Sequence, residues 1–186
     1  MSRLNFVSHR EIETPNGDNY ETEGEWNGWS AALSASASSE IDLGRIFLRP
    51  QLNVDWLTLS QDAYTETGGG DLLNASIGAV DTDRLTASAI LGIGTDFNVS
   101  GGTFRAEIEG GVRNRLSSTP FSTDVSYLGS DQSFTLTAEE DASEAAVFGI
   151  SLTGGNENTL LNFGYNIETS DAGTVHYTGA TVRIQF

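Results

Sequence analysis

Residues 174–186, at the carboxyl terminus, alternate between apolar and polar side chains. The apolar positions include Val182 and Ile184 and end on an aromatic residue, Phe186. A period of two predicts a β-strand with one apolar and one polar face. Chain termini usually fray, so a strand whose last residue is aromatic indicates a terminus that belongs to the folded structure.

The same alternation recurs along most of the chain. In the clearest case Phe104, Ala106 and Ile108 alternate with charged residues. This case is segment 103–116. The other segments with this pattern are 3–12, 28–38, 45–59, 82–97, 145–153 and 158–169. No stretch approaches the roughly 20 consecutive apolar residues of a membrane-spanning helix. The sequence therefore predicts an all-β fold with about eight antiparallel strands.

The links between these segments alternate in length. Short links rich in turn residues fall at 39–44, 98–102 and 154–157, and longer polar links fall at 13–23, 60–81 and 117–144. A brief turn at 170–173 precedes the last strand. Short turns on one side and long loops on the other are typical of a transmembrane up-and-down β-barrel. The pattern predicts that fold.

The charge distribution is strongly acidic. The chain has 26 acidic and 9 basic residues, a formal net charge of −17, which argues against a nucleic-acid partner. Sixteen of the acidic residues lie in segments 11–25, 60–83 and 117–143, which contain no Lys or Arg. We expect solvated outer loops there, because no metal-ligand spacing is visible. Cysteine is absent, which excludes a thiolate site, and we expect neither a metal nor a cofactor.

The energetics of burial decide which face meets lipid. An Arg side chain facing lipid costs up to about 2–4 kcal/mol near the bilayer midplane, so we expect the apolar face outward and the polar face around an aqueous lumen. The predicted lumen residues are Arg49, Asp55, Arg105, Glu107, Glu109 and Arg113. Aromatic residues near strand ends predict an interfacial girdle: Trp26, Trp29, Trp56, Phe97, Phe104 and Phe186. A soluble sheet remains an alternative, but it would need another layer to cover these apolar faces.

Several segments, taken in order, resemble the β-domain of autotransporters. They are 28–34 (GWSAALS), 41–45 (IDLGR), 48–57 (LRPQLNVDWL), 64–74 (YTETGGGDLLN), 83–87 (DRLTA) and 102–111 (GTFRAEIEGG), together with the terminal Phe. The resemblance implies a 12-stranded translocator in the bacterial outer membrane, which supports export of a covalently linked N-terminal passenger by type V secretion. It implies outer-membrane lipid and the barrel assembly machinery as further partners. The last strand of this chain resembles the signal that the assembly machinery reads, which ends on an aromatic residue. The matching residues here are Val182, Ile184 and Phe186.

The chain departs from the family pattern in two respects. Only eight strands are visible, and the helix that threads the pore in the family has no counterpart. We expect residues 1–186 to form one autotransporter-like barrel domain that lacks its N-terminal strands and pore helix. Eight strands could instead close into a self-contained small barrel, since eight is the low end for bacterial barrels.

Catalytic candidates are few. His9 and His176 alone could serve as bases at neutral pH, and neither lies in a recognisable nucleophile arrangement. We therefore expect no catalytic residue and no enzymatic activity. Two alternatives stay open: a small outer-membrane barrel with a structural or adhesive role through 60–81 and 117–144, and an outer-membrane hydrolase with its active site in those loops.

Overall fold

The computed structural model describes residues 1–14, 16–99, 101–138 and 142–185. These residues form thirteen β-strands and no helix, which confirms the all-β prediction. None of their segments forms a helix long and apolar enough to cross a membrane. The long strands are β1 (Ser2–Glu13), β2 (Asn19–Ser38), β4 (Phe47–Gln61), β7 (Val80–Val99), β8 (Gly102–Thr119), β11 (Glu144–Gly155), β12 (Thr159–Ser170) and β13 (Gly173–Ile184). The short strands are β3 (Ile41–Asp42), β5 (Tyr64–Thr65), β6 (Ala75–Ile77), β9 (Ser122–Tyr127) and β10 (Ser133–Thr137).

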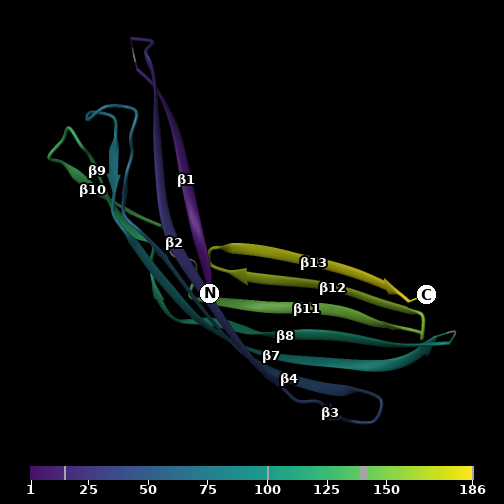
Figure 1. The fold of residues 1–186 in the computed structure, drawn as a ribbon. Helices are drawn as coiled ribbons and strands as arrows, with labels where there is room; N and C mark the ends of the chain where they lie inside the picture. The colour runs from purple at the N-terminus through teal and green to yellow at the C-terminus, as the bar shows by residue number, and fades with distance from the viewer. Residues whose placement is uncertain (15, 100, 139–141, 186) are drawn as a thin grey trace. The chain divides into compact units, whose positions relative to one another are not determined.

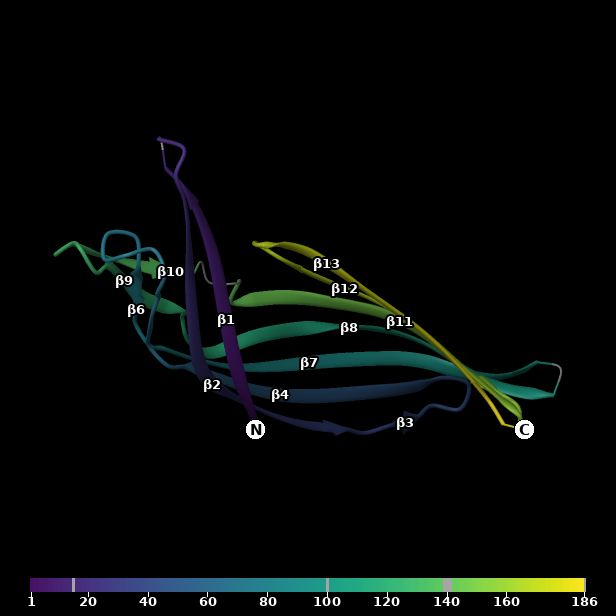
Figure 2. The same cartoon turned by 45° about the horizontal axis from the view of Figure 1, so that its top comes forward.

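The eight long strands form one sheet in chain order. The order is β1-β2-β4-β7-β8-β11-β12-β13, with β3 added beside β4 (Figures 1 and 2). The strand pairs are antiparallel, as in β1–β2, where Ser2 lies opposite Ser30 and Glu13 opposite Asn19. The up-and-down prediction is therefore confirmed. In the described sheet β1 and β13 are the edge strands.

Along most of these strands every second side chain is apolar, and this set, which we call the apolar phase, is exposed; the alternate set is the polar phase. Leu52 in β4 is 61% exposed, Ile108 in β8 is 59% exposed, and Phe148 and Ile150 in β11 are also exposed. Soluble proteins rarely expose large contiguous apolar surface, because leaving it in water forfeits the hydrophobic stabilisation of folding. A lipid environment removes that cost. The outward apolar face is therefore the one expected of a transmembrane barrel.

Internal contacts divide the chain into two compact units. The first comprises residues 1–33, 56–85 and 117–140, and contains β1 and the short strands of the long links. The second comprises residues 34–55, 86–116 and 141–186, and contains β3 and β11 to β13. Strands β2, β4, β7 and β8 contribute residues to both units. Each unit is described separately below.

The long links are more ordered than the sequence predicts. Segments 60–81 and 117–144, expected as polar loops, carry β5, β6, β9 and β10, which form a second sheet in the order β10-β9-β6-β5. Figure 2 labels β6 beside β9, and in that pair Ile77 lies opposite Val125. The loop prediction fails because strands of two to six residues are too short to show an alternating pattern. We call this sheet with its connecting turns, residues 62–79 and 120–138, the loop cap.

The first predicted long link is also shorter than expected. Segment 13–23 was expected as a loop, but β1 and β2 continue as a paired hairpin until Glu13 and Asn19. The turn is closed by backbone hydrogen bonds from Thr14 N to Asp18 O and from Gly17 N to Thr14 O, both 2.9 Å. Apart from Ile12, which lies opposite Tyr20, polar residues occupy the paired positions from Glu11 to Glu13, so no alternating pattern marked this extension.

The short links have the tight geometry predicted for them. In the turn after β3 the Gly44 backbone N–H donates to Asp42 Oδ1 at 2.7 Å. Gly44 has φ 92°, a conformation that costs glycine little and other residues more. An Asp side chain that accepts from the backbone two residues ahead is a common way to close a turn.

Candidate functional site

The polar phase of the second unit carries a cross-strand charge cluster. Arg49 in β4 donates to Glu107 in β8 through Nη2 at 2.7 Å and through Nε at 2.9 Å. Its Nη2 also lies 3.7 Å from Glu109 Oε2. Glu107 is only 7% exposed, so its carboxylate relies on this guanidinium for compensation. The structure thus brings together three of the residues that the sequence singled out.

Two glycines of β7 make room for this cluster. The Glu107 carboxylate fills the space beside Gly92 where any other residue would place its Cβ. The ring of Phe47, which is 4% exposed, lies in the same way over Gly94. The guanidinium carbon of Arg105 is 4.2 Å from the centroid of that ring. Gly92 and Gly94, on the polar phase of β7, therefore leave the space that the large side chains of Glu107 and Phe47 occupy.

The other predicted residues pair elsewhere on this face. Arg105 bonds to Asp96 and to Glu40, each at 2.8 Å. Arg113 in β8 bonds to Glu168 in β12, and Asp55 accepts from the Ser34 hydroxyl at 2.6 Å.

Arg49 holds both glutamates from a strand that is not their neighbour. It lies in β4, whereas Glu107 and Glu109 lie in β8, with β7 between the two strands. Neighbouring strands lie about 4.8 Å apart, so β4 and β8 are separated by about twice that distance. Arg49 and Glu107 meet over β7 because Gly92, which lies between them, has no side chain to block the contact.

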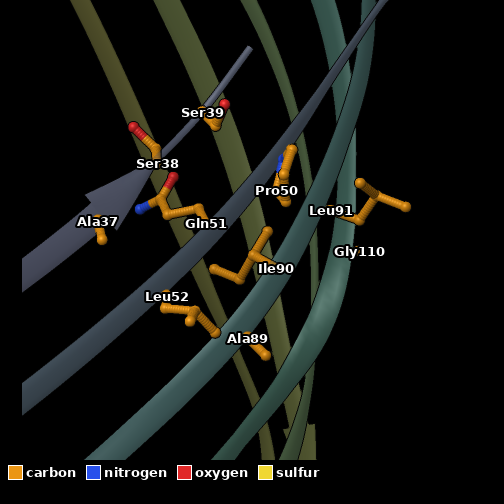
Figure 3. Close-up of a pocket in the computed structure, with 10 residues that line it drawn as sticks. All are labelled: Ala37, Ser38, Ser39, Pro50, Gln51, Leu52, Ala89, Ile90, Leu91 and Gly110. Atoms are coloured by element: carbon orange, nitrogen blue, oxygen red, sulfur yellow. The ribbon is translucent and has the colours of Figure 1, made fainter. Parts of the chain in front are cut away.

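The outward side of the second unit carries a shallow groove. Figure 3 shows side chains from β2, β4 and β7 around it. Its volume is about 550 Å³, and it is lined by Ala37, Ser38, Ser39, Pro50, Gln51, Leu52, Ala89, Ile90, Leu91 and Gly110. None of these side chains titrates near neutral pH. The groove arises where Ala37, Ala89 and Gly110 leave space between Leu52 and Leu91.

The residues expected to form the assembly signal lie on β13. Val182 is 62% and Ile184 is 55% exposed, both on the apolar phase. Phe186 lies outside the described residues.

The two histidines show no catalytic arrangement among the described residues. His9 Nε2 is 3.8 Å from Glu23 Oε1, and both side chains are exposed. His176 Nδ1 is 2.8 Å from the Tyr165 hydroxyl. No nucleophile accompanies either imidazole in these contacts.

The first unit contains a charged residue that the sequence did not indicate. Arg10 of β1 donates through Nε to Glu66 Oε1 at 3.3 Å and through Nη2 to the second carboxylate oxygen. The same Nη2 donates to Leu73 O at 2.8 Å. The guanidinium carbon lies 5.9 Å from the ring centroid of Tyr127. Arg10 thereby joins β1 to both long links; its partners lie 56 or more residues away in the sequence, which is why no local pattern revealed them.

Glu66 is held in its charged form. Burial of this carboxylate acts to raise its pKa, but hydrogen bonds from Arg10 and from the Ala75 backbone N–H, together with the Arg10 charge, outweigh burial and keep the pKa below its usual range. Glu66 is 5% exposed. Burial, followed by the negative charge of Glu66, raises the pKa of the neighbouring Tyr64 hydroxyl. Arg10, whose side chain is 35% exposed, and the buried Glu66 thus form a half-buried ion pair with additional backbone partners.

An aromatic stack lies on the same face of the β1–β2 hairpin. Trp26 packs between Phe6, at a centroid distance of 5.2 Å, and Tyr64, at 4.0 Å. The Trp26 indole N–H donates to Gln61 Oε1 at 3.0 Å. Trp26 was expected in the interfacial girdle, and this was wrong, because it occupies the opposite phase from Trp29. The girdle remains a prediction for Trp29, which is 37% exposed.

Comparison with known proteins gives a family assignment. The family model described as autotransporter beta-domain matches residues 1–166. A search of curated proteins finds no match. The matched region includes the long strands β1 to β11, the Arg49–Glu107–Glu109 cluster and the loop cap. This chain belongs to the autotransporter β-domain family, the outer-membrane translocators that support export of a linked passenger by type V secretion.

Proposed function

We propose that the polar face of the long strands encloses the aqueous route through which the passenger is exported. The residues assigned to the lumen are Arg49, Asp55, Arg105, Glu107, Glu109 and Arg113. The observation that carries this proposal is the network of ion pairs on that face, opposite an exposed apolar phase. A polar interior and an apolar exterior are the arrangement of membrane-spanning barrels. The family match favours export over an adhesive or structural surface role and over a hydrolase.

We further propose that residues 1–186 form one barrel domain completed by additional strands, as in a 12-stranded barrel. In the described sheet β1 and β13 each pair on one side only. Open edges expose unpaired backbone groups, which are not tolerated in hydrocarbon. Added strands and a pore helix would satisfy those edges and fill the lumen.

The surface chemistry supports one partner, and the resemblance of the last strand to the family's assembly signal supports a second. Outer-membrane lipid would cover the exposed apolar phase, including the groove of Figure 3. The barrel assembly machinery would read Val182, Ile184 and Phe186 at the end of β13. The barrel itself would act as an anchor and a route without enzymatic activity, since His9 and His176 lie in exposed, non-catalytic contacts.

Export is tested by deletion in the native full-length protein. Removing residues 1–186 should leave the passenger in the periplasm, detected by its protection from protease added to intact cells. A passenger that reaches the surface at the normal level without these residues would overturn the proposed function.

The orientation of the two faces is tested by cysteine labelling. The chain has no cysteine, so single substitutions are unambiguous. Asn53→Cys, on the polar phase, should react with a water-soluble maleimide. Val54→Cys, its immediate neighbour on the apolar phase, should react poorly with that reagent and be quenched by lipid-attached spin labels. The reverse pattern would place the lumen on the other face.

A further inference from the structure

The loop cap packs against one particular face of the β1–β2 hairpin. Within the first unit, Thr22, Gly24, Trp26 and Gly28 share a phase of β2. The opposite phase carries Glu21, Glu23 and Glu25 near the tip of the hairpin and continues along β2 into Trp29 and Leu33, which are exposed and apolar. The cap therefore lies on the side of the hairpin that faces away from lipid.

Glycines on both sides of the contact allow this close approach. A Cβ at Gly24 of the hairpin would lie 2.6 Å from the Tyr64 ring and 3.7 Å from Glu66 Cγ, both in the loop cap. On the cap side, a Cβ at Gly69 would lie 2.7 Å from the Thr22 side chain. Backbone hydrogen bonds of 2.9 Å join Glu23 and Thr67 in both directions. The cap is thus held to the hairpin by close packing and by backbone hydrogen bonds.

The two long links are joined to each other as well as to the hairpin. Leu128 N donates to Asn74 O at 3.1 Å and Gly129 N donates to Asp71 O at 2.6 Å. The Thr123 hydroxyl, which is buried, donates to Gly78 O at 2.9 Å. Because Arg10 contacts Glu66, Leu73 and Tyr127, it reaches both links at once. Arg10 therefore ties both links of the cap to β1.

We propose that the loop cap is a lid over the polar side of the hairpin and that the Arg10–Glu66 ion pair is its clasp. The proposal rests on the proposed function, because a lid is meaningful only if the polar side is an aqueous route. Breaking a buried ion pair leaves an unpaired buried charge, which favours the open arrangement. The clasp thereby sets how often the polar side of the hairpin is open to water.

Opening is measured by labelling a buried position of the cap. Ala75 is 5% exposed, so Ala75→Cys should react slowly with a membrane-impermeant maleimide in intact outer membranes. Adding Arg10→Gln should accelerate labelling by about tenfold or more. The matched control is His9→Gln, the neighbouring residue on the exposed face, which should leave the rate unchanged. An unchanged rate in folded Arg10→Gln protein would overturn the clasp.

Gating is measured by the conductance of the purified full-length chain in planar bilayers. Arg10→Gln should raise the time-averaged conductance. The double variant Glu23→Cys with Thr67→Cys provides a lock, because hydrogen-bonded partners in antiparallel strands lie about 5.5 Å apart at Cα, within disulfide range. The oxidised double variant should conduct less than its reduced form. Equal conductance in both redox states would overturn the lid, and this test stands even if Arg10→Gln fails to fold. Passenger export plays no part in either readout, so failure of the lid and failure of the translocator are distinguishable.

Discussion

The Glu107 carboxylate occupies the space that a side chain at position 92 would need, so Gly92 and Glu107 form a matched pair across β7 and β8. The same carboxylate is the principal partner of Arg49. The size of residue 92 and the charge pairing of the polar face are thereby coupled.

Gly92→Ala should destabilise the barrel by about 1–3 kcal/mol, because the added methyl group displaces the Glu107 carboxylate from Arg49. The measurement is the temperature at which the folded, fast-migrating band is lost on a semi-native gel. Gly164→Ala is the matched control, since a Cβ there meets no atom within 4 Å. An equal, small effect in both variants would contradict the coupling.

Arg49→Gln should cost about 2–3 kcal/mol, somewhat below the value for a fully buried pair, because the Arg49 side chain is 32% exposed. Its loss leaves Glu107 without its cation and beside Glu109. Denaturant unfolding in detergent provides the free energy. His9→Gln, which removes an exposed contact with Glu23, should cost at most about 1 kcal/mol. If the two substitutions lower the free energy of unfolding by the same amount, burial of Glu107 does not strengthen its pairing with Arg49.

The loop cap should loosen in acid. The pKa of Glu66 is lower in the folded protein than its ordinary value of 4.5, so the Arg10 pair contributes its full stability above about pH 4.5 and loses it as pH falls through the lower folded value. Tyr64 and Tyr127 are the other titratable groups in contact with this pair.

The acid response is measured by the fluorescence of Trp26, which stacks on Tyr64, in a chain carrying Trp29→Phe and Trp56→Phe. The signal should be constant from pH 7 to about 4.5 and change below that range. Adding Glu66→Gln should make the signal independent of pH in this window. A transition of the same size in the Gln variant would assign the response to another group.

Deletion of Phe186 should impair insertion into the outer membrane, as should Val182→Asp and Ile184→Asp on the same phase of β13. Each change removes an apolar group from the strand that resembles the assembly signal. The yield of heat-modifiable, membrane-integrated protein is the measurement. Thr181→Asp, on the polar phase, is the control and should insert normally. Normal insertion of the Phe186 deletion would count decisively against this role.

The eight long strands could be predicted from the sequence because each has one face in lipid and one in water. That contrast is recorded residue by residue, as in Ile108 beside Glu107 and Glu109. The partners on the polar face could not be predicted, because they depend on strand register, which brings Arg49 to Glu107 from 58 residues away. Periodicity identifies a face but not the neighbour across it.

The loop cap was missed for a related reason. Tyr64–Thr65 is a strand of two residues, and its order comes from Trp26 and Arg10 on another hairpin. The run Gly68-Gly69-Gly70 lies in segment 60–81, which was expected as a polar loop. In the structure Gly69 packs closely against Thr22. A sequence pattern does not distinguish a glycine needed for close packing from a glycine in a loop.

The exposed apolar phase has a consequence for how this chain can change over generations. A side chain such as Leu52 or Ile108 meets fluid acyl chains, which conform to any hydrocarbon shape, so Leu, Ile, Val and Phe should be interchangeable there. Gly92 and Glu107 have no such freedom, since each is shaped to the other. Homologous sequences should therefore drift on the outside and stay fixed on the inside, the opposite of what a water-soluble protein with a packed core displays.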